Sequence, residues 1–251
     1  MRLSYQLYSS REFPPLSDTL AMLKRVGYAE VEGFGGLYVD PPGLKSALDG
    51  AGLVMTSGHF GLDMLEDEPE RAIGIAQTVG MKAVFCPHIA ADLRPSDAAG
   101  WHAFGARLQK AGEPIRAAGL IYGWHNHNFE FAALPDGTFP MDAILAGGPD
   151  LAWQADIAWI VRGGADPLEW IDRYGDRIAA IHIKDIAPAG ECVDEDGWAD
   201  VGQGTMPWPA IFRRVKEKTP AKLFVMEHDK PNDDVRFATR SFEAVNSFGD
   251  N

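Results

Sequence analysis

Trp124-His125-Asn126-His127-Asn128-Phe129-Glu130 decides the fold together with three later segments, because each joins a strand-like apolar run to residues that commonly bind metal ions. The later segments are Gln154-Ala155-Asp156, Ile181-His182-Ile183-Lys184-Asp185 and Val225-Met226-Glu227-His228-Asp229. Helix-like stretches separate the four. Carboxylate and imidazole groups at the carboxyl ends of successive parallel strands converge at one end of a barrel. The pattern therefore predicts an α/β fold of the (β/α)8 barrel type with a metal site.

A strand followed by a helix recurs along the whole chain. Strands are expected at residues 3–8, 29–34, 54–59, 83–88, 120–127, 151–157, 179–184 and 223–227. Helical patterns occur, for example, at residues 16–26, 69–79, 98–118, 167–174, 208–218 and 235–248. Such alternation implies parallel strands with helical crossovers. Eight units in 251 residues match a barrel formed by one domain over residues 1–251.

Two further features of the sequence favour the barrel: the positions of its glycines and the absence of a dinucleotide-binding motif after the first strand. Gly27, Gly52, Gly80 and Gly119 each fall between a helix and the next strand, where a left-handed residue commonly ends the helix. A doubly wound open sheet is the competing fold, but no Gly-x-Gly-x-x-Gly turn follows the first strand, as a dinucleotide site requires.

The composition of the chain indicates which classes of binding partner and which cell compartment to expect. The formal net charge of −13 disfavours nucleic-acid binding, which depends on Lys and Arg neutralising phosphates. The two cysteines form no disulfide framework and fit a reducing compartment. Neither an apolar signal core at the N-terminus nor a run of about 18 apolar residues is present. We therefore expect a cytoplasmic protein with no membrane partner. Composition leaves open whether it is a monomer or a homo-oligomer.

Side-chain alternation selects the residues that face the barrel axis. Asp156, His182, Lys184 and Glu227 should all point inward. A buried carboxylate is costly unless it is paired or bound to a metal. A ring of salt bridges among these four residues is one interpretation, and a metal centre is the favoured one. Hard oxygens with one or two imidazoles suit Mn²⁺, Mg²⁺, Co²⁺ or Zn²⁺.

The fifth strand carries two histidines and a glutamate. His125 and His127 are two residues apart and should both face inward, with Glu130 just beyond the strand. We expect Glu130 to be a metal ligand and His127 to be a general base, because imidazole has a pKa near neutrality. His125 should lie close to the metal, either beside the ligands or as a substitute for one of them.

These motifs resemble the xylose isomerase-like barrels, in the branch of sugar epimerases, isomerases and keto-sugar or keto-inositol dehydratases. The resemblance covers nearly the whole chain and is most specific at residues 125–131, Asp156, residues 182–185, residues 202–208 and Glu227. It implies one divalent ion held by Glu, Asp, His and Glu from the fifth to eighth strands. Asp156, His182 and Glu227 match three of these ligands. Where many relatives have the first Glu, this chain has His125, so a two-glutamate epimerase mechanism does not transfer intact.

The resemblance implies a metal-dependent isomerase or epimerase that acts on a keto-sugar or polyol-like small carbohydrate through an enediolate. His127 is the expected base, with Glu227 or Glu130 on the opposite side of the sugar ring. The alternative is a dehydratase or lyase acting on a keto-inositol or a 3-keto-glycoside at the same site. A DNA-repair endonuclease on the related barrel conflicts with the acidity of the chain, and a sugar-binding barrel without turnover conflicts with the intact ligands.

Other residues have weaker expected roles. Glu32 and His59 end the second and third strands and could hold sugar hydroxyls or serve as caps. His88, at the end of the fourth strand, could take either of the same roles. Lys184 could stabilise an enolate oxygen or simply pair with Asp156 or Glu227. Trp208, like Trp124, Phe129 and Trp159, could stack on a sugar ring or belong to the packing. The acidic stretch 188–204 is the longest irregular segment and could cover the substrate or be a solvated loop.

Overall fold

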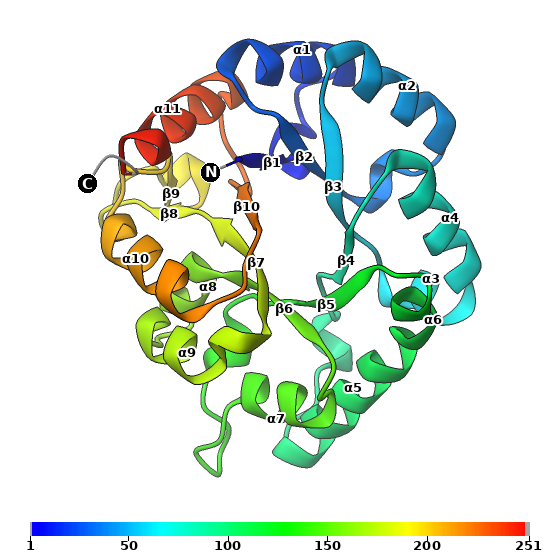
Figure 1. Cartoon of the computed structure of the whole chain (residues 1–251). Coiled ribbons are helices and arrows are strands. Elements are labelled where there is room, and N and C mark those ends of the chain that lie inside the picture. Colours follow the sequence, from blue (N-terminus) through cyan, green and yellow to red (C-terminus); the bar gives the residue numbers. More distant parts are fainter. Residues whose placement is uncertain (1, 249–251) are drawn as a thin grey trace.

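Figure 1 looks down the axis of a closed barrel of parallel strands surrounded by helices. The computed structural model describes residues 2–248, so residues 1 and 249–251 of the expected domain lie outside the described residues. The strands close in the order β1-β10-β7-β6-β5-β4-β3-β2, which confirms the predicted fold. Their bounds are β1 (Ser4–Gln6), β2 (Glu30–Gly33), β3 (Val54–His59), β4 (Ala83–Cys86), β5 (Ile121–His125), β6 (Ala152–Asp156), β7 (Ile178–Ile183) and β10 (Leu223–Met226).

The helices lie outside the strands and largely follow the sequence pattern. They are α1 (Leu16–Val26), α2 (Pro41–Ala51), α3 (Leu62–Asp67), α4 (Pro69–Val79), α5 (Ala98–Ala111), α6 (Glu113–Ala117), α7 (Pro140–Gly147), α8 (Ile157–Arg162), α9 (Pro167–Tyr174), α10 (Trp208–Lys218) and α11 (Asp234–Ser247). The single helix expected at 98–118 is wrong. It divides into α5 and α6 because Pro114 has no N–H and its ring clashes with the preceding turn.

Left-handed glycines end several helices, as the sequence indicates. Gly27, Gly52 and Gly80 follow α1, α2 and α4 with φ of 119°, 66° and 89°. Gly119 follows α6 with φ of 82°. An L-residue rarely adopts this conformation, so these positions fix where each helix turns towards its next strand.

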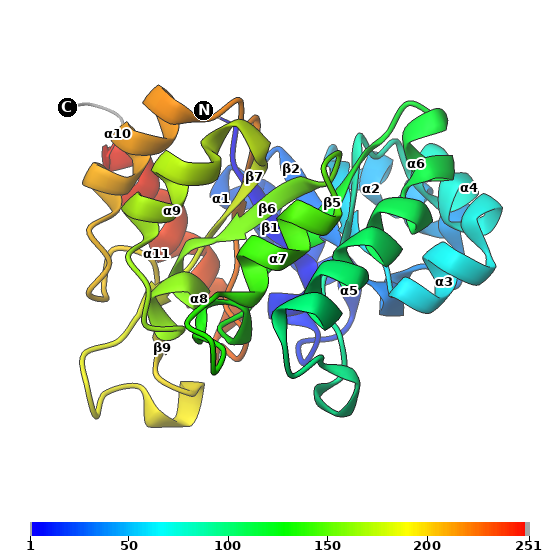
Figure 2. The same cartoon turned by 90° about the horizontal axis from the view of Figure 1, so that it is seen from below.

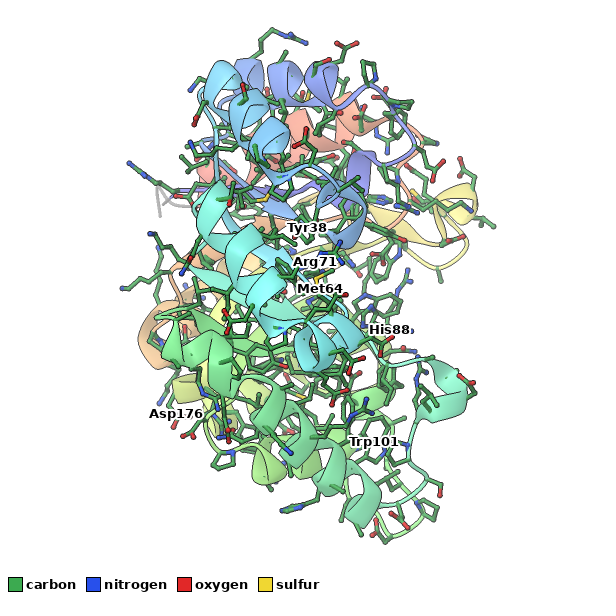
Figure 3. The ribbon with its side chains drawn as sticks, turned by 90° about the vertical axis from the view of Figure 1, so that its right-hand side faces the viewer. Tyr38, Met64, Arg71, His88, Trp101 and Asp176 are labelled. Carbon is green, nitrogen blue, oxygen red and sulfur yellow. The ribbon has the colours of Figure 1, made fainter. Side chains whose placement is uncertain are left out.

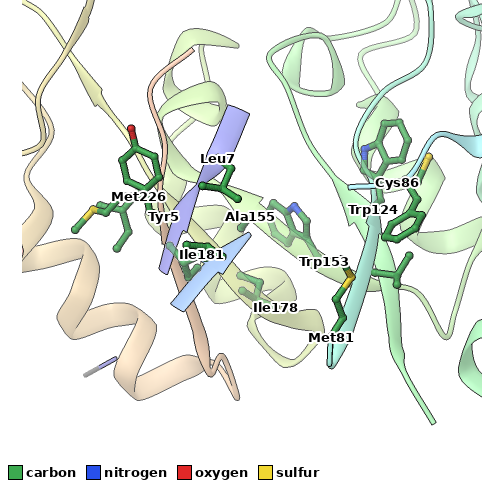
Figure 4. Packing of buried hydrophobic residues seen from close by; sticks show 14 of the residues in the cluster. Tyr5, Leu7, Met81, Cys86, Trp124, Trp153, Ala155, Ile178, Ile181 and Met226 are labelled. Carbon is green, nitrogen blue, oxygen red and sulfur yellow. The ribbon is translucent and has the colours of Figure 1, made fainter. Parts of the chain in front are cut away.

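Two apolar layers hold the barrel together. Outward-facing strand residues pack beneath the helices, and Figure 4 shows this for Tyr5, Trp124, Trp153, Ile181 and Met226. Inside the barrel, a small apolar plug is formed by Ala83, Phe85, Ala180 and Leu223. Polar and charged side chains replace this plug towards the carboxyl ends of the strands.

Gly123 allows β5 and β6 to approach closely. A Cβ at this position would lie 2.0 Å from the backbone oxygen of Ala152 on β6. Only glycine fits there, and the tight contact places His125 in register with Gln154 two residues later.

The segment between β7 and α10 is more ordered than the expected irregular stretch. It contains β8 (Asp185–Ile186), paired antiparallel with β9 (Trp198–Ala199), and a short 3-10 helix, η6 (Val193–Glu195). Figure 2 shows this yellow segment extending beyond one end of the barrel. The carboxylate of Asp185 accepts the N–H groups of Ile186, Gly202 and Met206, which fixes the glycine-containing turn before α10.

Candidate active site

Four side chains from four neighbouring strands bring potential metal-binding atoms together at the carboxyl end of the barrel. One such atom from each of His125, Asp156, His182 and Glu227 lies within 4.8 Å of the others, and all four residues are buried. His125 and Asp156 end β5 and β6, His182 is the penultimate residue of β7, and Glu227 follows β10; these strands are adjacent in the barrel. Strand register places Asp156 opposite His182, so the convergence follows from the pairing of the sheet.

His182 lies between two carboxylates. Its Nδ1 is 2.8 Å from Glu227 Oε2, and its Nε2 is 2.7 Å from Glu32 Oε1. Burial acts to lower the pKa of His182, but the two carboxylates outweigh it and raise this pKa to about 10. Because an imidazole must be neutral to bind a metal ion, loading the site requires His182 to lose this proton.

Lys184 is a counter-charge for three carboxylates. Its Nζ lies 2.8 Å from Asp229 Oδ1, 3.0 Å from Glu227 Oε2 and 3.2 Å from Asp156 Oδ2. Burial acts to raise the pKa of Glu227, yet Lys184 and His182 hold that pKa well below its usual value. The side chain of Lys184 is completely buried. This position supports pairing with carboxylates rather than direct contact with an enolate oxygen, the other expected role of Lys184.

Asn126, between the two histidines of the motif, is buried and positions the end of β6. Asn126 Oδ1 accepts the backbone N–H of Asp156 at 3.0 Å, and its Nδ2 donates to the carbonyl of Asp156 at 3.1 Å. These bonds fix the end of β6 against β5. The alternating motif thus supplies His125 and His127 to the cavity and uses Asn126 to position Asp156.

The structure places Glu130 apart from the four-residue group, contrary to its expected position as a ligand. Its carboxylate accepts Trp124 Nε1 at 2.9 Å and the backbone N–H of His127 at 3.0 Å. β5 ends at His125 and the chain then enters the 3-10 helix η4 (Phe129–Phe131), so Glu130 lies beyond the strand alternation. Burial raises the pKa of Glu130 to about 8. His125 stands in the group instead.

His127 lies on the wall of the cavity beside this group. Its ring centroid is 5.1 Å from that of His125 and 5.7 Å from that of His88. Among the described residues, its buried Nδ1 has no hydrogen-bond partner. Burial, assisted by the charge of Lys184, lowers the pKa of His127 to about 3, so the imidazole is neutral and is a weak base unless negative charge develops beside it.

His59 lines the cavity at the barrel mouth, as expected, but Glu32 does not line it. Glu32 is fully buried and accepts hydrogen bonds from Gln6, Ser57 and Gln154. Burial acts to raise its pKa, but His59 and His182 hold that pKa far below its usual value. His59 lines the cavity, whereas Glu32 supports His182 from beneath.

A cavity of about 650 Å³ opens above the cluster. It is lined by Tyr8, Arg11, Phe34, Gly35, His59, Gly61, Pro87, His88, His125, His127, Trp159, Arg162, Asp196, Trp198, Glu227, Asp229 and Lys230. Figure 3 shows His88 on the same side of the molecule as the yellow segment after β7. That segment contributes Asp196 and Trp198, so it forms part of the wall.

Trp208 was expected to contact the sugar, but it does not line the cavity. Other residues that were not expected do line it. Trp208 is completely buried at the start of α10 and packs against Phe212, with ring centroids 5.2 Å apart, so it belongs to the core. Asp229 and Trp198 reach the cavity without having been predicted. The signal for Asp229 is its place two residues after Glu227, whereas Trp198 lies within a loop that gives no periodic signal.

The donor atoms fit a divalent ion. Two imidazoles and two carboxylates suit Zn²⁺ and, with water, other divalent ions of the first transition series. Asp156 Oδ2 is buried and makes no hydrogen bond within residues 2–248, although Lys184 Nζ lies 3.2 Å away. A buried carboxylate oxygen of this kind is the atom that metal coordination would satisfy. His125, Asp156, His182 and Glu227 are therefore the residues that could hold the ion.

Comparison with protein families agrees with this geometry. The model of the xylose isomerase-like TIM barrel family matches residues 20–245. The chain belongs to this family. None of the curated proteins matches the chain, and no helix in the described part is long and apolar enough to cross a membrane.

Solved structures share the family's barrel. A sugar phosphate isomerase/epimerase from Parabacteroides distasonis is 22% identical with a TM-score of 0.82, covering 96% of this chain and 92% of that one. The probable 3-DHS dehydratase AsbF from Bacillus anthracis is 16% identical with a TM-score of 0.77, covering 98% and 99%. The IolI protein with a bound zinc atom is 16% identical with a TM-score of 0.72, covering 99% and 96%. These similarities establish the fold.

Proposed function

We propose that this protein is a single-domain, divalent-metal-dependent enzyme that isomerises or epimerises a keto-sugar or polyol-like substrate through an enediolate. The observation that carries the proposal is the meeting of His125, Asp156, His182 and Glu227 beneath a cavity that His127 also lines. The names of the similar isomerase/epimerase and of the zinc-containing IolI protein support the same class of site.

A divalent ion in this position would supply Lewis acidity, which makes the carbon next to a carbonyl group more acidic. His127 takes the proton from that carbon. The C–H electron pair forms the new carbon–carbon double bond, and the carbonyl π pair moves onto oxygen. For isomerisation, a proton returns to the former carbonyl carbon, the hydroxyl proton on the deprotonated carbon moves to the former carbonyl oxygen, and the deprotonated carbon becomes the new carbonyl carbon. For epimerisation, a proton returns to the opposite face of the same carbon.

Glu227 and His127 divide the proton-transfer work unequally. Glu227 lines the cavity but is held anionic by Lys184 and His182, so it stabilises cationic neighbours better than it donates protons. His127 starts neutral, and its protonated form is stabilised by the negative charge that develops on the substrate. An imidazole and a carboxylate thus replace the two matched glutamates of the family's epimerase pattern.

This asymmetry favours a second candidate function, elimination from a keto-inositol or a 3-keto-glycoside. After His127 removes the proton, the electron pair of the enediolate expels a β-hydroxide or β-alkoxide, which leaves as water or an alcohol once protonated. The ring centroids of His88 and His127 are 5.7 Å apart, and both residues line the cavity. A second imidazole therefore lies near His127, which donates the proton to the leaving group. The dehydratase among the similar structures supports this outcome.

Product analysis in D₂O tests both candidates. The protein is stripped of metal, reloaded separately with Mn²⁺, Mg²⁺, Co²⁺ or Zn²⁺, and incubated with a ketohexose, a keto-inositol and a 3-keto-glycoside. Deuterium at the carbon next to the carbonyl, with a rearranged or inverted sugar, supports isomerisation or epimerisation. An unsaturated product with released water or alcohol supports elimination.

A substrate deuterated at the same carbon makes the test decisive. A shielded proton shuttle can return the original proton, so low solvent incorporation alone decides nothing. A primary isotope effect is expected wherever C–H cleavage limits the rate. Absence of both incorporation and an isotope effect, in a reaction whose chemical step is rate-limiting, contradicts proton abstraction.

A further inference from the structure

We propose that the outer half of the cavity is a second subsite, which takes a planar aromatic ring attached to the sugar. This inference rests on the proposed function, because it defines the substrate as an aryl-substituted sugar. The juxtaposition that carries it is the placement of Tyr8 and Phe34 across the cavity mouth from Trp159.

The aromatic side chains come from opposite sides of the barrel. Tyr8 and Phe34 follow β1 and β2, and their ring centroids are 5.4 Å apart in an edge-to-face contact. Trp159 belongs to α8 after β6, which lies across the closed strand order from β1 and β2. All three line the same cavity. A flat ring between them could contact aromatic surface on both sides.

Each aromatic group is stiffened by a neighbour. The guanidinium of Arg11 lies 3.9 Å over the ring of Tyr8 and donates to the carbonyl oxygen of Asp229 at 2.7 Å. Across the mouth, Trp159 packs edge-to-face against Trp198 at 4.7 Å between ring centroids, and Trp198 itself is buried. Such pre-ordering reduces the side-chain entropy that binding would otherwise cost.

The cations at the mouth are already engaged by the protein. Arg162 lies 3.2 Å over Trp198 and donates to the carbonyl oxygen of Asp196 at 2.8 Å. Lys230 pairs with the carboxylate of Asp196 at 3.1 Å. The carboxylates of Glu227 and Asp229 on the cavity wall oppose an additional anion. This arrangement favours an uncharged aromatic substituent over a phosphate group.

Size and polarity agree with two subsites. A cavity of about 650 Å³ lies in the middle of the range of about 300–1,000 Å³ that is typical of pockets for drug-sized ligands, so it exceeds the needs of one sugar ring. The imidazoles and carboxylates of the inner half suit hydroxyl and carbonyl groups. Tyr8 is 38% exposed although it is a large aromatic residue at the mouth, and an aryl ring stacked there would cover it.

Equilibrium binding separates this subsite from the reaction. Metal-loaded wild-type protein is titrated calorimetrically with methyl and phenyl 3-keto-glucosides, and the ratio of their dissociation constants is measured. Each aromatic contact should contribute about 3- to 10-fold in affinity. We expect the phenyl compound to bind at least about 10-fold more tightly, and Phe34→Ala to reduce this preference about 3- to 10-fold.

Val54→Ala is the matched control, because Val54 is 51% exposed at the start of β3, away from the carboxyl ends of the strands. It should retain the wild-type ratio. Equal affinities for the two compounds, binding of neither, or an unchanged ratio in both Phe34→Ala and Tyr8→Ala overturns the subsite. Tighter binding of methyl 3-keto-glucoside 6-phosphate than of the phenyl compound also overturns it. Selective phenyl binding without turnover supports the subsite and contradicts only the proposed reaction.

Discussion

Two networks of buried ion pairs follow the last strands of the barrel, and they differ in which atoms they leave unpaired. In the central network, His182 and Lys184 pair with carboxylates beneath the cavity. In the peripheral network, Arg236 on α11 pairs with Glu195 and Asp200 of the segment after β7.

The peripheral network holds a loop against a helix. Arg236 Nη2 lies 2.6 Å from Glu195 Oε1, and its Nε lies 3.0 Å from Asp200 Oδ2. Glu195 and Asp200 flank the short stretch that carries Asp196 and Trp198 to the cavity. Both carboxylates therefore have partners on α11, and their role is to position the wall.

In and beside the central network, atoms without a hydrogen bond within residues 2–248 lie on Asp229 and His127, which line the cavity, and on Asp156, which does not line it but is ion-paired with Lys184. Asp156 Oδ2, Asp229 Oδ2 and His127 Nδ1 are buried and lack hydrogen-bond partners among the described residues. Buried polar atoms are normally satisfied, so a group of exceptions beside a cavity indicates a ligand or metal. Burial of charge alone therefore does not mark a functional site, whereas buried polar atoms without a hydrogen bond beside a cavity point to one.

Asp156 is the residue of the central network whose substitution should affect metal binding most. Loss of residues that merely orient metal ligands costs about 10- to 100-fold in affinity, so Asp156→Asn should cost at least about 100-fold. Asparagine keeps an oxygen for the N–H of Trp159, which Asp156 accepts at the start of α8. Metal content by mass spectrometry and activity should both fall. Asp166→Asn, at the equivalent cap of α9, should retain both; equal metal content in the two variants removes Asp156 from the ligand set.

His127 tests whether the unpaired atoms take part in chemistry. Loss of a general base typically costs about 10²–10⁴-fold in rate, so His127→Ala should lose kcat to that extent while retaining its metal. The exposed His102 on α5 provides the control, and His102→Ala should keep wild-type kcat and metal content. A wild-type kcat in His127→Ala, on a verified substrate, transfers the base role to Glu227 or His125.

Arg236 tests whether the peripheral network contributes to stability without affecting the metal site. Arg236→Ala leaves Glu195 and Asp200 buried without their main partner, and breaking a buried pair costs about 3–5 kcal/mol. The side chain of Arg236 is 23% exposed, so we expect about 2 kcal/mol in urea unfolding, with metal content unchanged. Arg240 also contacts Asp200 but is 56% exposed, and Arg240→Ala should cost less than about 0.5 kcal/mol. Equal losses of stability in the two variants would mean that the ion pairs of Arg236 with Glu195 and Asp200 do not hold the loop in place.

The barrel was predictable because its signals are local and repeated. Strand-like runs, helical periodicity and glycines such as Gly27 and Gly80 recur in every part of the chain. The inward direction of Asp156 and His182 followed from alternation within regular strands. These two features required no knowledge of long-range contacts.

The errors lie where regular structure ends. Alternation no longer applies after His125, so Glu130 could not be placed from the sequence, and its carboxylate turns back to Trp124. Trp208 could not be distinguished as core or cavity because it begins a helix after a turn fixed by Asp185. Trp198 reaches the cavity only through a hairpin held by Arg236, a partner nearly 40 residues later in the chain.

Glu130 is a buried carboxylate that belongs to neither network, and its contribution to stability should depend on pH. Its hydrogen bonds come from neutral donors, Trp124 Nε1 and the N–H of His127, and burial raises its pKa from 4.5 to about 8. A carboxyl group whose pKa is raised on folding stabilises the fold fully below its unfolded pKa and loses this contribution as the pH rises through its folded pKa. The free energy of unfolding should therefore decrease between about pH 5 and pH 8, by up to about 1.4 kcal/mol per pH unit.

Glu130→Gln removes the titrating group and should flatten this dependence in urea unfolding measured across the same pH window. The amide keeps one acceptor for two donors, so the variant should be less stable than the wild type at pH 5, and the difference should shrink towards pH 8. Glu70→Gln, at an exposed position on α4, should follow the wild-type curve. Parallel curves for wild type and Glu130→Gln would mean that Glu130 is ionised throughout, and a cation or metal ion would then have to lie closer to it than the structure places one.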